Sequence, residues 1–286
     1  MKKHMITICC LLLPAISLLA QLQVSADKRF LITTNGKPFF WLGDTAWELF
    51  HRLTREEADL YLSDRAAKGF TVIQAVVLAE LDGLHTPNVY GSTPLINDDP
   101  TKPNEVYFQH VDYIVNKAAK LGLVIAMLPS WGDKWNQKRG TGPEIFTAAN
   151  ARVYGEYLGR RYKNKPIIWV MGGDRDVEEQ ADYDIIRAMA AGLKKGDGGH
   201  HLFTFHPQGG KSASDFFKDD DWIDIHMSQT GHSSEAQNYK FNMKNRALTP
   251  VHPYLDGEPS YEDHPDNWNP AKLGWMDDFV TRQKAY

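Results

Sequence analysis

Cysteine is almost absent from this chain of 286 residues, because Cys9 and Cys10 are the only two and both lie in an apolar N-terminal stretch. Once that stretch is removed, the lack of thiols excludes disulfide bonds, a cysteine nucleophile and thiolate ligands for a metal. Cations are also few: 32 Lys and Arg stand against 36 Asp and Glu, a formal charge of −4. This charge argues against nucleic acid or an anionic membrane as a partner and suits a neutral carbohydrate.

The N-terminal stretch has the composition of a signal peptide. Residues 2–4 are polar or basic, residues 5–19 are mostly apolar, and Ala20 offers the small side chain at which such peptides are cleaved. The apolar run is too short to span a membrane. We therefore expect residues 1–20 to be removed and residues 21–286 to be exported to the periplasm, the cell surface or the extracellular space. Loss of the two lysines in this stretch takes the formal charge to −6, with 30 basic and 36 acidic residues.

Internal repeats, low-complexity tracts and interdomain linkers are absent from the sequence, which argues for one domain. Short apolar runs instead alternate with helical patterns, and the clearest run, residues 167–174, has the composition of a strand buried on both faces. Strands are predicted at residues 39–44, 71–79, 123–128, 167–174, 201–206, 222–228 and 251–258. Helices are predicted at residues 54–69, 105–121, 147–162, 180–195, 233–248 and 272–286. The alternation predicts an α/β fold with a parallel sheet and right-handed crossovers.

A chain of this length and pattern is expected to fold as a (β/α)8 TIM barrel, which needs eight parallel strands. The turn Asn35-Gly36 predicts a β-hairpin before the first barrel strand, but a hairpin arm cannot supply a parallel strand. We therefore expect the barrel domain, residues 21–286, to be truncated after the seventh strand and helix. Residues 80–104 contain Pro, Gly and Asn between elements and are predicted to form a long functional loop.

Two acidic residues stand at predicted strand ends, on the face where barrel enzymes carry their active sites. Asp174 ends the fourth strand, and Glu258 ends the seventh in the sequence Asp-Gly-Glu-Pro. Two carboxyl groups across one cleft can break a glycosidic bond, because one protonates the leaving oxygen while the other attacks the sugar or activates water. Alternatively, Asp174 caps the next helix and Glu258 is a turn residue before Pro259.

Other polar and aromatic residues near predicted strand ends are candidates for contacts with a sugar. They are Asp44, Gln74, Trp131, His206, His226 and Gln229. Structural alternatives are a helix cap for Asp44, a core amide network for Gln74, core packing for Trp131 and structural roles for the two histidines. His200 and His201 precede a strand at the opposite end of the barrel and are expected at the surface.

Two other functions fit the same residues. His206 and His226 end neighbouring strands, as ligands of a metal-dependent barrel hydrolase would, but the first strand lacks a His-x-His pair and no candidate for a carboxylated lysine is in position. A non-catalytic barrel that binds glycans would keep the cleft without turnover. The two-carboxylate arrangement favours hydrolysis, which needs no metal ion and no organic cofactor.

Five segments carry a resemblance to a known family: residues 43–47 (GDTAW), 66–74 (AAKGFTVIQ), 131–135 (WGDKW), 172–174 (GGD) and 256–259 (DGEP). In this order they resemble the apiosidase-like family of glycoside hydrolases over about residues 29–286. The resemblance implies a (β/α)8 barrel that hydrolyses glycans, with release of apiose from pectin side chains as the characterised activity. It also implies that Asp174 is the general acid/base and Glu258 the nucleophile. We expect retention of configuration, which requires the two carboxyl groups about 5 Å apart.

Overall fold

The computed structural model describes residues 21–138, 140–233 and 235–261 of the chain. Its centre is a five-stranded sheet in the order β10-β9-β8-β5-β4, in which every neighbouring pair is parallel. The strands are β4 (Gly43–Thr45), β5 (Val72–Leu78), β8 (Val124–Ser130), β9 (Ile167–Gly172) and β10 (Phe203–His206). All of β5, β8 and β9 is buried, as their continuous apolar sequences predict.

Two more parallel strands extend this sheet into a curved wall. The main-chain nitrogen of Asp224 donates to the Phe203 carbonyl at 2.9 Å, which joins the segment before β12 (His226–Gln229) to β10. β12 in turn pairs in parallel with β13 (Tyr254–Asp256). Gln74 Nε2 on β5 donates to the Gly257 carbonyl just after β13 at 2.6 Å, so the two ends of the wall approach each other. Within the described residues, seven parallel strands are therefore present in chain order, although β4 covers only the end of the strand predicted at residues 39–44.

The helices begin and end at the signals that the sequence carries. Capping boxes at Thr54 and Thr147 begin α1 (Arg55–Ala67) and α3 (Ala148–Tyr162). The C-cap of α4 is Gly198, whose φ of +75° suits glycine, and the helix continues two residues beyond its predicted end at residue 195. The helix bounds are α2, Glu105–Lys120; α4, Gln180–Asp197; α5, Ser214–Phe217; and α6, Asn238–Arg246. The helix predicted at residues 272–286 lies outside the described residues.

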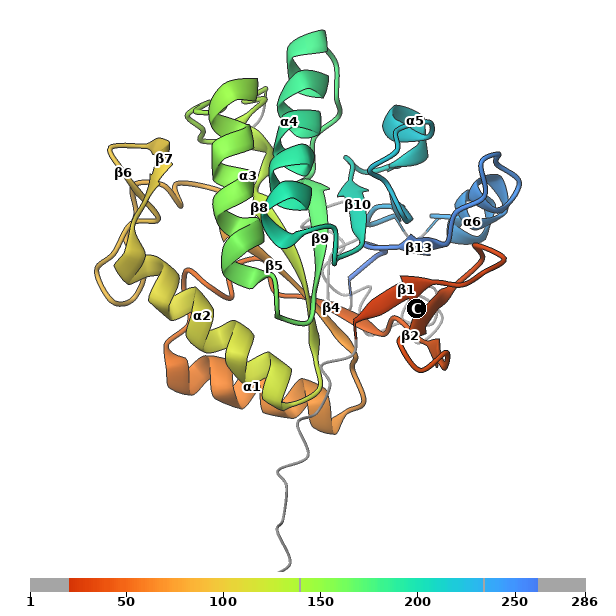
Figure 1. Cartoon of the computed structure of the whole chain (residues 1–286), viewed down its shortest axis with the longest axis horizontal. Helices are drawn as coiled ribbons and strands as arrows, with labels where there is room; N and C mark the ends of the chain where they lie inside the picture. The colour runs from red at the N-terminus through yellow and green to blue at the C-terminus, as the bar shows by residue number, and fades with distance from the viewer. Residues whose placement is uncertain (1–20, 139, 234, 262–286) are drawn as a thin grey trace, which may run out of the picture.

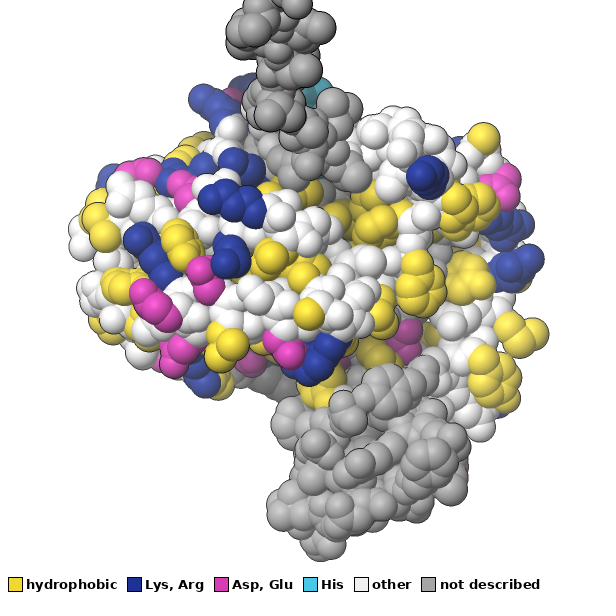
Figure 2. All heavy atoms as spheres, turned by 90° about the horizontal axis from the view of Figure 1, so that it is seen from below, with side chains coloured by type: hydrophobic (Ala, Val, Ile, Leu, Met, Phe, Trp, Pro, Cys, Tyr) yellow, Lys and Arg dark blue, Asp and Glu magenta, His cyan; other side chains and the backbone are white. Residues whose placement is uncertain are grey.

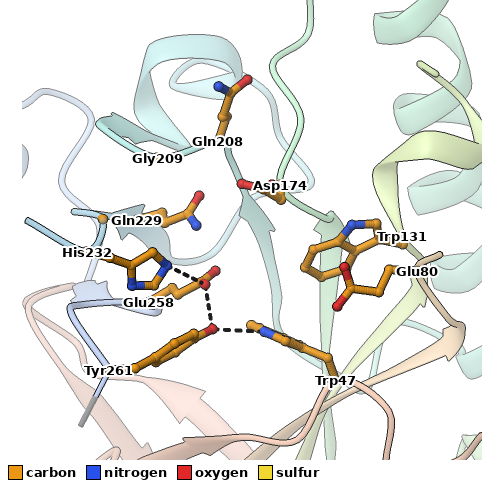
Figure 3. Close-up of a pocket in the computed structure, with 11 residues that line it drawn as sticks. Trp47, Glu80, Trp131, Asp174, Gln208, Gly209, Gln229, His232, Glu258 and Tyr261 are labelled. Atoms are coloured by element: carbon orange, nitrogen blue, oxygen red, sulfur yellow. Dashed lines mark hydrogen bonds and ion pairs between the residues drawn. The ribbon is translucent and has the colours of Figure 1, made fainter. Parts of the chain in front are cut away.

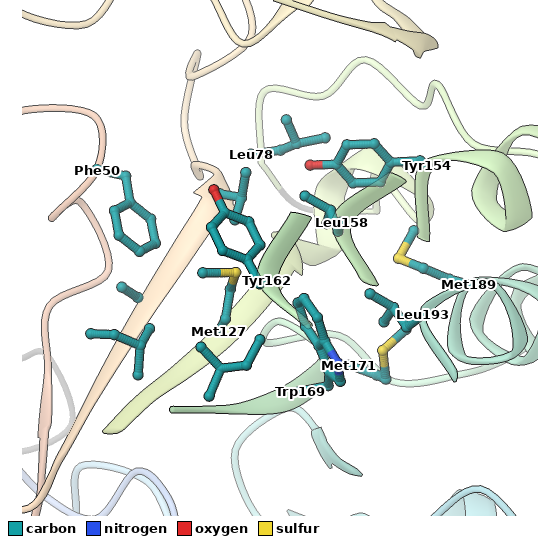
Figure 4. Packing of buried hydrophobic residues seen from close by; sticks show 14 of the residues in the cluster. Phe50, Leu78, Met127, Tyr154, Leu158, Tyr162, Trp169, Met171, Met189 and Leu193 are labelled. Atoms are coloured by element: carbon teal, nitrogen blue, oxygen red, sulfur yellow. The ribbon is translucent and has the colours of Figure 1, made fainter. Parts of the chain in front are cut away.

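Alternate side chains of the barrel strands enter two separate apolar cores. On β5, Ile73 and Val77 pack toward the helices, whereas Val72 and Val76 belong to the inner core. Trp169 on β9 belongs to the outer core, which Figure 4 shows between the sheet and helices α3 and α4. Helices α1 to α4 lie along the outside of the sheet (Figure 1). Successive side chains of a strand point to opposite faces, so one strand register supplies residues to both cores. The parallel strands all end at the same edge of the sheet, which is the barrel mouth.

Four helical glycines let α3 and α4 pack side by side, as Figure 1 shows. A Cβ atom at Gly155 or Gly159 of α3 would overlap a carbonyl oxygen of α4, and a Cβ at Gly192 or Gly196 of α4 would overlap one of α3. The close approach of the two backbones therefore depends on the missing side chains.

Smaller elements complete the structure. β1 (Leu22–Val24), β2 (Leu31–Thr33) and β3 (Pro38–Phe39) form an antiparallel sheet that contains the hairpin predicted at Asn35-Gly36. Leu22 and Leu31 belong to the inner core with the first residues of β5 and β8, so this sheet closes the end of the barrel opposite the mouth. Further short elements are β6 (Leu95–Ile96), β7 (Asp99–Pro103), the 3-10 helix η1 (Gly132–Lys134) and β11 (Lys211–Ser212).

Four predictions about the fold need correction. The predicted loop at residues 80–104 contains the antiparallel pair β6 and β7. The sixth barrel strand begins at residue 226 rather than 222, and α6 is shorter than the helix predicted at residues 233–248. His201 is not at the surface: its side chain is 6% exposed, and Nδ1 lies 2.9 Å from a carboxylate oxygen of buried Asp197. Asp197 is buried and also accepts a hydrogen bond from the Trp169 indole, so an imidazole that contacts this carboxylate must lie inward.

The outer helices carry an ordinary solvated surface. Figure 2 shows basic and acidic side chains interspersed over the half of the molecule that carries α1 and α2. Arg65 and Lys68, for example, both contact Asp64. Among the described residues, every helix is too short or too polar to span a lipid bilayer.

We predict that Gly192→Ala lowers the free energy of unfolding by about 1–3 kcal/mol, because the new methyl group forces α3 and α4 apart. Alanine would normally stabilise an exposed helix by about 0.5–1 kcal/mol relative to glycine. Urea unfolding followed by circular dichroism measures the difference, with exposed Lys194→Ala on the same helix as the control. An increase in stability for Gly192→Ala would contradict the close packing.

Candidate active site

A pocket of about 370 Å3 opens at the C-terminal ends of the barrel strands. Figure 3 shows carboxyl groups, large aromatic rings, amides and an imidazole around it. The lining residues are Trp47, Glu80, Trp131, Asp174, Gln208, Gly209, Gln229, Gly231, His232, Glu258 and Tyr261. Asp174 and Glu258, far apart in the sequence, therefore share one pocket, as predicted from the strand ends.

Glu258 is a buried carboxylate held by three side chains. It lies two residues after β13, and only 5% of the residue is exposed. Tyr261 Oη donates to Glu258 Oε1 at 2.5 Å, and His232 Nε2 lies 3.3 Å from the same oxygen. His206 Nε2 lies 2.9 Å from Oε2. These contacts exclude the alternative in which Glu258 is simply an exposed turn residue.

Burial and hydrogen bonding act in opposite directions on Glu258. Burial raises its pKa, but contacts from His206, His232 and Tyr261 outweigh burial and lower the pKa to about 2. The side chain is therefore ionised at neutral pH. An ionised carboxylate in a fixed orientation is the form that can attack an electrophilic carbon.

His206 connects the two acids. Its Nδ1 accepts a long hydrogen bond from the main-chain N–H of Asp174 at 3.4 Å, while its Nε2 faces Glu258. An imidazole that accepts at Nδ1 carries its proton at Nε2, so the positive edge of the His206 ring is the side that contacts the Glu258 carboxylate. The sequence predicted that His206 contacts substrate; in the structure it is fully buried behind Glu258.

Asp174 occupies a constrained backbone position at the end of β9. Gly172, Gly173 and Asp174 all have positive φ, at +94°, +112° and +55°. Asp174 is not the cap of α4, because that helix begins six residues later with Glu179 as its N-cap. Its main-chain carbonyl accepts a hydrogen bond from Arg175 Nη1 at 2.6 Å, which helps to hold this conformation. The side chain is 36% exposed and faces the pocket.

The pKa of Asp174 shifts in the direction opposite to that of Glu258. Burial raises it first, and the charge of Glu258 raises it further, against lowering contributions from His206 and Arg175. One pocket therefore contains one carboxyl group that keeps its charge and one that takes up a proton more readily. This asymmetry is what an acid and a nucleophile need.

The segment at residues 131–135 supports the pocket wall. The main-chain nitrogen of Gly132 donates to the Gly173 carbonyl at 2.9 Å, and a Cβ on Gly132 would overlap that oxygen. Lys134 and Asp133 form a fully buried ion pair at 2.8 Å beneath it. Trp131 is thereby fixed next to Asp174, and it packs against Trp47 with ring centroids 5.3 Å apart.

The predicted substrate-contacting residues fall into three groups. Trp131 and Gln229 line the pocket. Gln74 and His206 are buried behind it, where Gln74 holds the Gly257 carbonyl next to Glu258. Asp44 and His226 are not brought into this pocket: Asp44 contacts Arg65 and Tyr61, and the His226 ring packs on His252 with centroids 4.6 Å apart.

Several pocket residues were not selected from the sequence. Trp47 lies in the segment at residues 43–47, and its indole Nε1 donates to Tyr261 Oη at 2.9 Å. Tyr261 and His232 come from loops, for which spacing gives no signal. Glu80, at the end of the second strand, meets the strand-end criterion that selected Asp174, but no specific role was assigned to it from the sequence.

The histidines do not form a metal centre with the neighbouring acids. Within residues 21–138, 140–233 and 235–261, no group of three or more His, Cys, Asp or Glu side chains is arranged to hold a metal ion. His206 and His226, the pair considered from the sequence, are directed to Glu258 and His252 respectively.

Comparison with known proteins identifies a family and several similar structures. A family model described as the apiosidase-like catalytic domain matches residues 25–286. A glycoside hydrolase family 5 protein from Bacteroides vulgatus is 33% identical with a TM-score of 0.78, over 87% of this chain and 55% of that one. A second structure, described as a glycoside hydrolase, is 31% identical with a TM-score of 0.78, over 92% of this chain and 64% of that one. This chain thus spans between half and two thirds of the length of these two structures.

More distant structures share the fold. The catalytic domain of the Thermobifida fusca endoglucanase Cel5A is 11% identical with a TM-score of 0.54, over 93% of this chain and 82% of that one. The predicted (β/α)8-barrel class is confirmed by these likenesses together with the parallel strand order. A comparison with curated proteins returned no match.

The low pKa of Glu258 predicts a pH-dependent contribution to stability. Because the folded pKa is about 2 and the ordinary value is 4.5, the contribution is present above pH 4.5 and is lost as pH falls toward 2. It amounts to about 3 kcal/mol at neutral pH, of which about 2 kcal/mol is lost by pH 3. The difference in unfolding free energy between wild type and Glu258→Gln should therefore shrink by about that amount between pH 7 and pH 3.

Urea unfolding at pH 7, 4.5 and 3 measures this difference. Glu56→Gln, in the exposed first turn of α1, is the matched control and should follow the wild type at every pH. A difference for Glu258→Gln that is the same at pH 7 and pH 3 would show that Glu258 is not a stabilised carboxylate.

Proposed function

This chain belongs to the apiosidase-like catalytic-domain family, and from that premise we propose that it is a glycoside hydrolase that uses Asp174 and Glu258. The observation that carries the proposal is the shared pocket in which these two carboxyl groups have opposite pKa shifts. Hydrolysis of a glycosidic bond requires one acid that gives up a proton and one carboxylate that stays charged.

In the first step, Asp174 transfers its proton to the glycosidic oxygen as the bond from that oxygen to the anomeric carbon breaks. A Glu258 oxygen forms a new bond to the anomeric carbon, which gives a covalent glycosyl ester. In the second step, Asp174 takes a proton from water, the water oxygen bonds to the anomeric carbon, and Glu258 leaves as a carboxylate. Asp174 ends protonated, and one water molecule has been consumed.

We propose the retaining form of this reaction because of how Glu258 is held. Both of its oxygens contact donors, and the residue is only 5% exposed. An inverting enzyme needs room for a water molecule between its base and the sugar. A carboxylate packed among His206, His232 and Tyr261 is better suited to direct attack.

We propose plant cell-wall polysaccharide, with apiose-containing pectin side chains foremost, as the substrate. The family description supports apiose. Trp47, Trp131 and Tyr261 supply aromatic surfaces that suit sugar rings. The signal-like composition of residues 1–20 supports export, which would place the protein where such polysaccharides occur.

We predict that Asp174→Asn and Glu258→Gln each lower hydrolysis by about 1,000-fold or more, because the first removes the general acid/base and the second the nucleophile while both keep the side-chain shape. The assay is monosaccharide release from apiose-, arabinose- and galactose-containing plant oligosaccharides. Circular dichroism at neutral pH checks that both variants fold.

Exposed acids provide the controls: Asp184→Asn on α4 and Glu56→Gln on α1 should hydrolyse at the wild-type rate. Full activity in either pocket variant would refute the assignment of that residue. Sugar binding by wild type without turnover in calorimetry would instead favour a glycan-binding barrel. Proton NMR of the first product anomer tests retention separately, since an inverted product would exclude the covalent ester but not the two-carboxylate pair.

A further inference from the structure

Glu80 is a third carboxyl group in the pocket, and its backbone is held by a tight turn. It lies two residues after β5, and Leu81 next to it has a φ of +53°. The main-chain nitrogen of Gly83 donates to the Glu80 carbonyl at 3.1 Å, and a Cβ on Gly83 would lie 2.7 Å from the Ala79 carbonyl oxygen. Figure 3 shows the Glu80 carboxyl directed into the pocket beneath Trp131.

Glu80 also lines a second pocket, of about 300 Å3, together with His51, Arg52, Asp82, Thr86 and Val89. We call this the outer pocket. Its walls are tied together by the His51 ring, whose Nδ1 lies 2.8 Å from Glu48 Oε2 and whose Nε2 lies 2.8 Å from the Thr86 carbonyl oxygen. The loops after β4 and β5 are thereby fixed to each other, so the outer pocket is preformed.

Within the part of the chain that the structure describes, the Glu80 carboxyl has no hydrogen bond or ion pair, and the residue is partly buried in the pocket wall. The nearby cations are engaged elsewhere: Arg52 contacts Glu48 at 3.4 Å, and Lys134 contacts Asp133. His51 is likewise bound to Glu48. Solvent reaches the Glu80 oxygens through the pocket, so a ligand hydroxyl group can reach them as well.

Burial and the surrounding acids raise the pKa of Glu80, so that a large fraction of this carboxyl group is protonated near neutral pH. Burial raises its pKa first, the charges of Glu48, Asp174, Glu258 and Asp133 add to the effect, and the pKa reaches about 7. A protonated carboxyl group both donates and accepts a hydrogen bond. A sugar hydroxyl group does the same, so the two groups are complementary.

We propose that the active-site pocket and the outer pocket form one cleft for a glycan of two or more sugar units, and that Glu80 binds a sugar hydroxyl group where the units meet. This inference rests on the proposed function, because it takes the ligand to be a glycan that is cleaved between Asp174 and Glu258. It adds a substrate length and a binding residue that the two-acid mechanism does not require.

The test compares one-unit and longer ligands. The probes are methyl apioside and a purified apiose-containing pectic oligosaccharide; their dissociation constants are measured by calorimetry in the Asp174→Asn background, which prevents turnover. We expect Glu80→Ala to reduce the preference for the oligosaccharide over methyl apioside about tenfold. Glu80→Gln should restore most of it, because an amide also donates and accepts. Glu56→Ala is the exposed control and should leave the preference unchanged.

A pH profile gives a second signature. In otherwise wild-type protein, kcat/KM for the oligosaccharide should fall as pH rises through about 7, because Glu80 loses the proton that it donates, and Glu80→Gln should weaken that fall. Asp82 is the other acid of the outer pocket. Its Oδ1 lies 2.8 Å from His85 Nδ1, so Asp82 already has a partner and does not donate to the sugar hydroxyl group.

Each of the remaining results contradicts either the two-pocket cleft or the proposed function. Equal losses for both ligands in Glu80→Ala, no loss for either, or no binding of the oligosaccharide would overturn the two-pocket cleft. Hydrolysis that persists without any dependence on Glu80 would refute this inference and leave the proposed function standing. Length-dependent binding by Glu80 without hydrolysis in wild type would refute the proposed function and leave the cleft.

Discussion

The buried charge of Glu258 is the constraint around which the pocket is arranged. A carboxylate removed from water is unfavourable unless polar groups replace the lost solvent. Those groups come from separate parts of the chain: His206 from the end of β10, His232 from the loop after β12, and Tyr261 three residues beyond Glu258. The sheet must therefore curl far enough to bring β10, β12 and β13 together. Gln74 completes this closure, since its amide reaches from β5 to the Gly257 carbonyl. Barrel curvature and an ionised Glu258 thus depend on each other.

The neighbouring acid is governed by its backbone. Positive φ at a non-glycine residue is unusual, and such strained positions persist only where the surroundings hold them. Asp174 is held on both sides: its N–H donates to His206 Nδ1, and its carbonyl accepts from Arg175. The Gly132 N–H fixes the preceding peptide through the Gly173 carbonyl. One imidazole, His206, therefore orients the backbone of Asp174 and contacts the carboxylate of Glu258, so the two acids cannot shift independently.

The sequence was informative wherever one physical rule dominated locally. Continuous apolar runs located β5, β8 and β9, and the Thr54 capping box located the start of α1. Strand ends located Asp174 and Glu258 because parallel strands share one edge. Contacts decided over long range were not predictable in this way. His201 turns inward only because Asp197 is buried beside it, and Tyr261 and His232 reach Glu258 from loops without periodicity. Asp44 satisfied the strand-end rule, but Arg65 and Tyr61 hold it elsewhere.

Three acids in one pocket would repel one another if all were charged. Glu258 escapes this because its donors outweigh burial, and its charge then raises the pKa values of Asp174 and Glu80. Stabilising one carboxylate therefore favours protons on the other two. Asp174, with a solvent-facing side chain beside His206, can exchange its proton, as an acid/base must. Glu80 lies against the outer pocket, away from those donors, and retains its proton nearer to neutral pH. Three chemically similar side chains thus acquire the distinct roles proposed for nucleophile, acid and hydroxyl-binding group from unequal access to donors rather than from residue type.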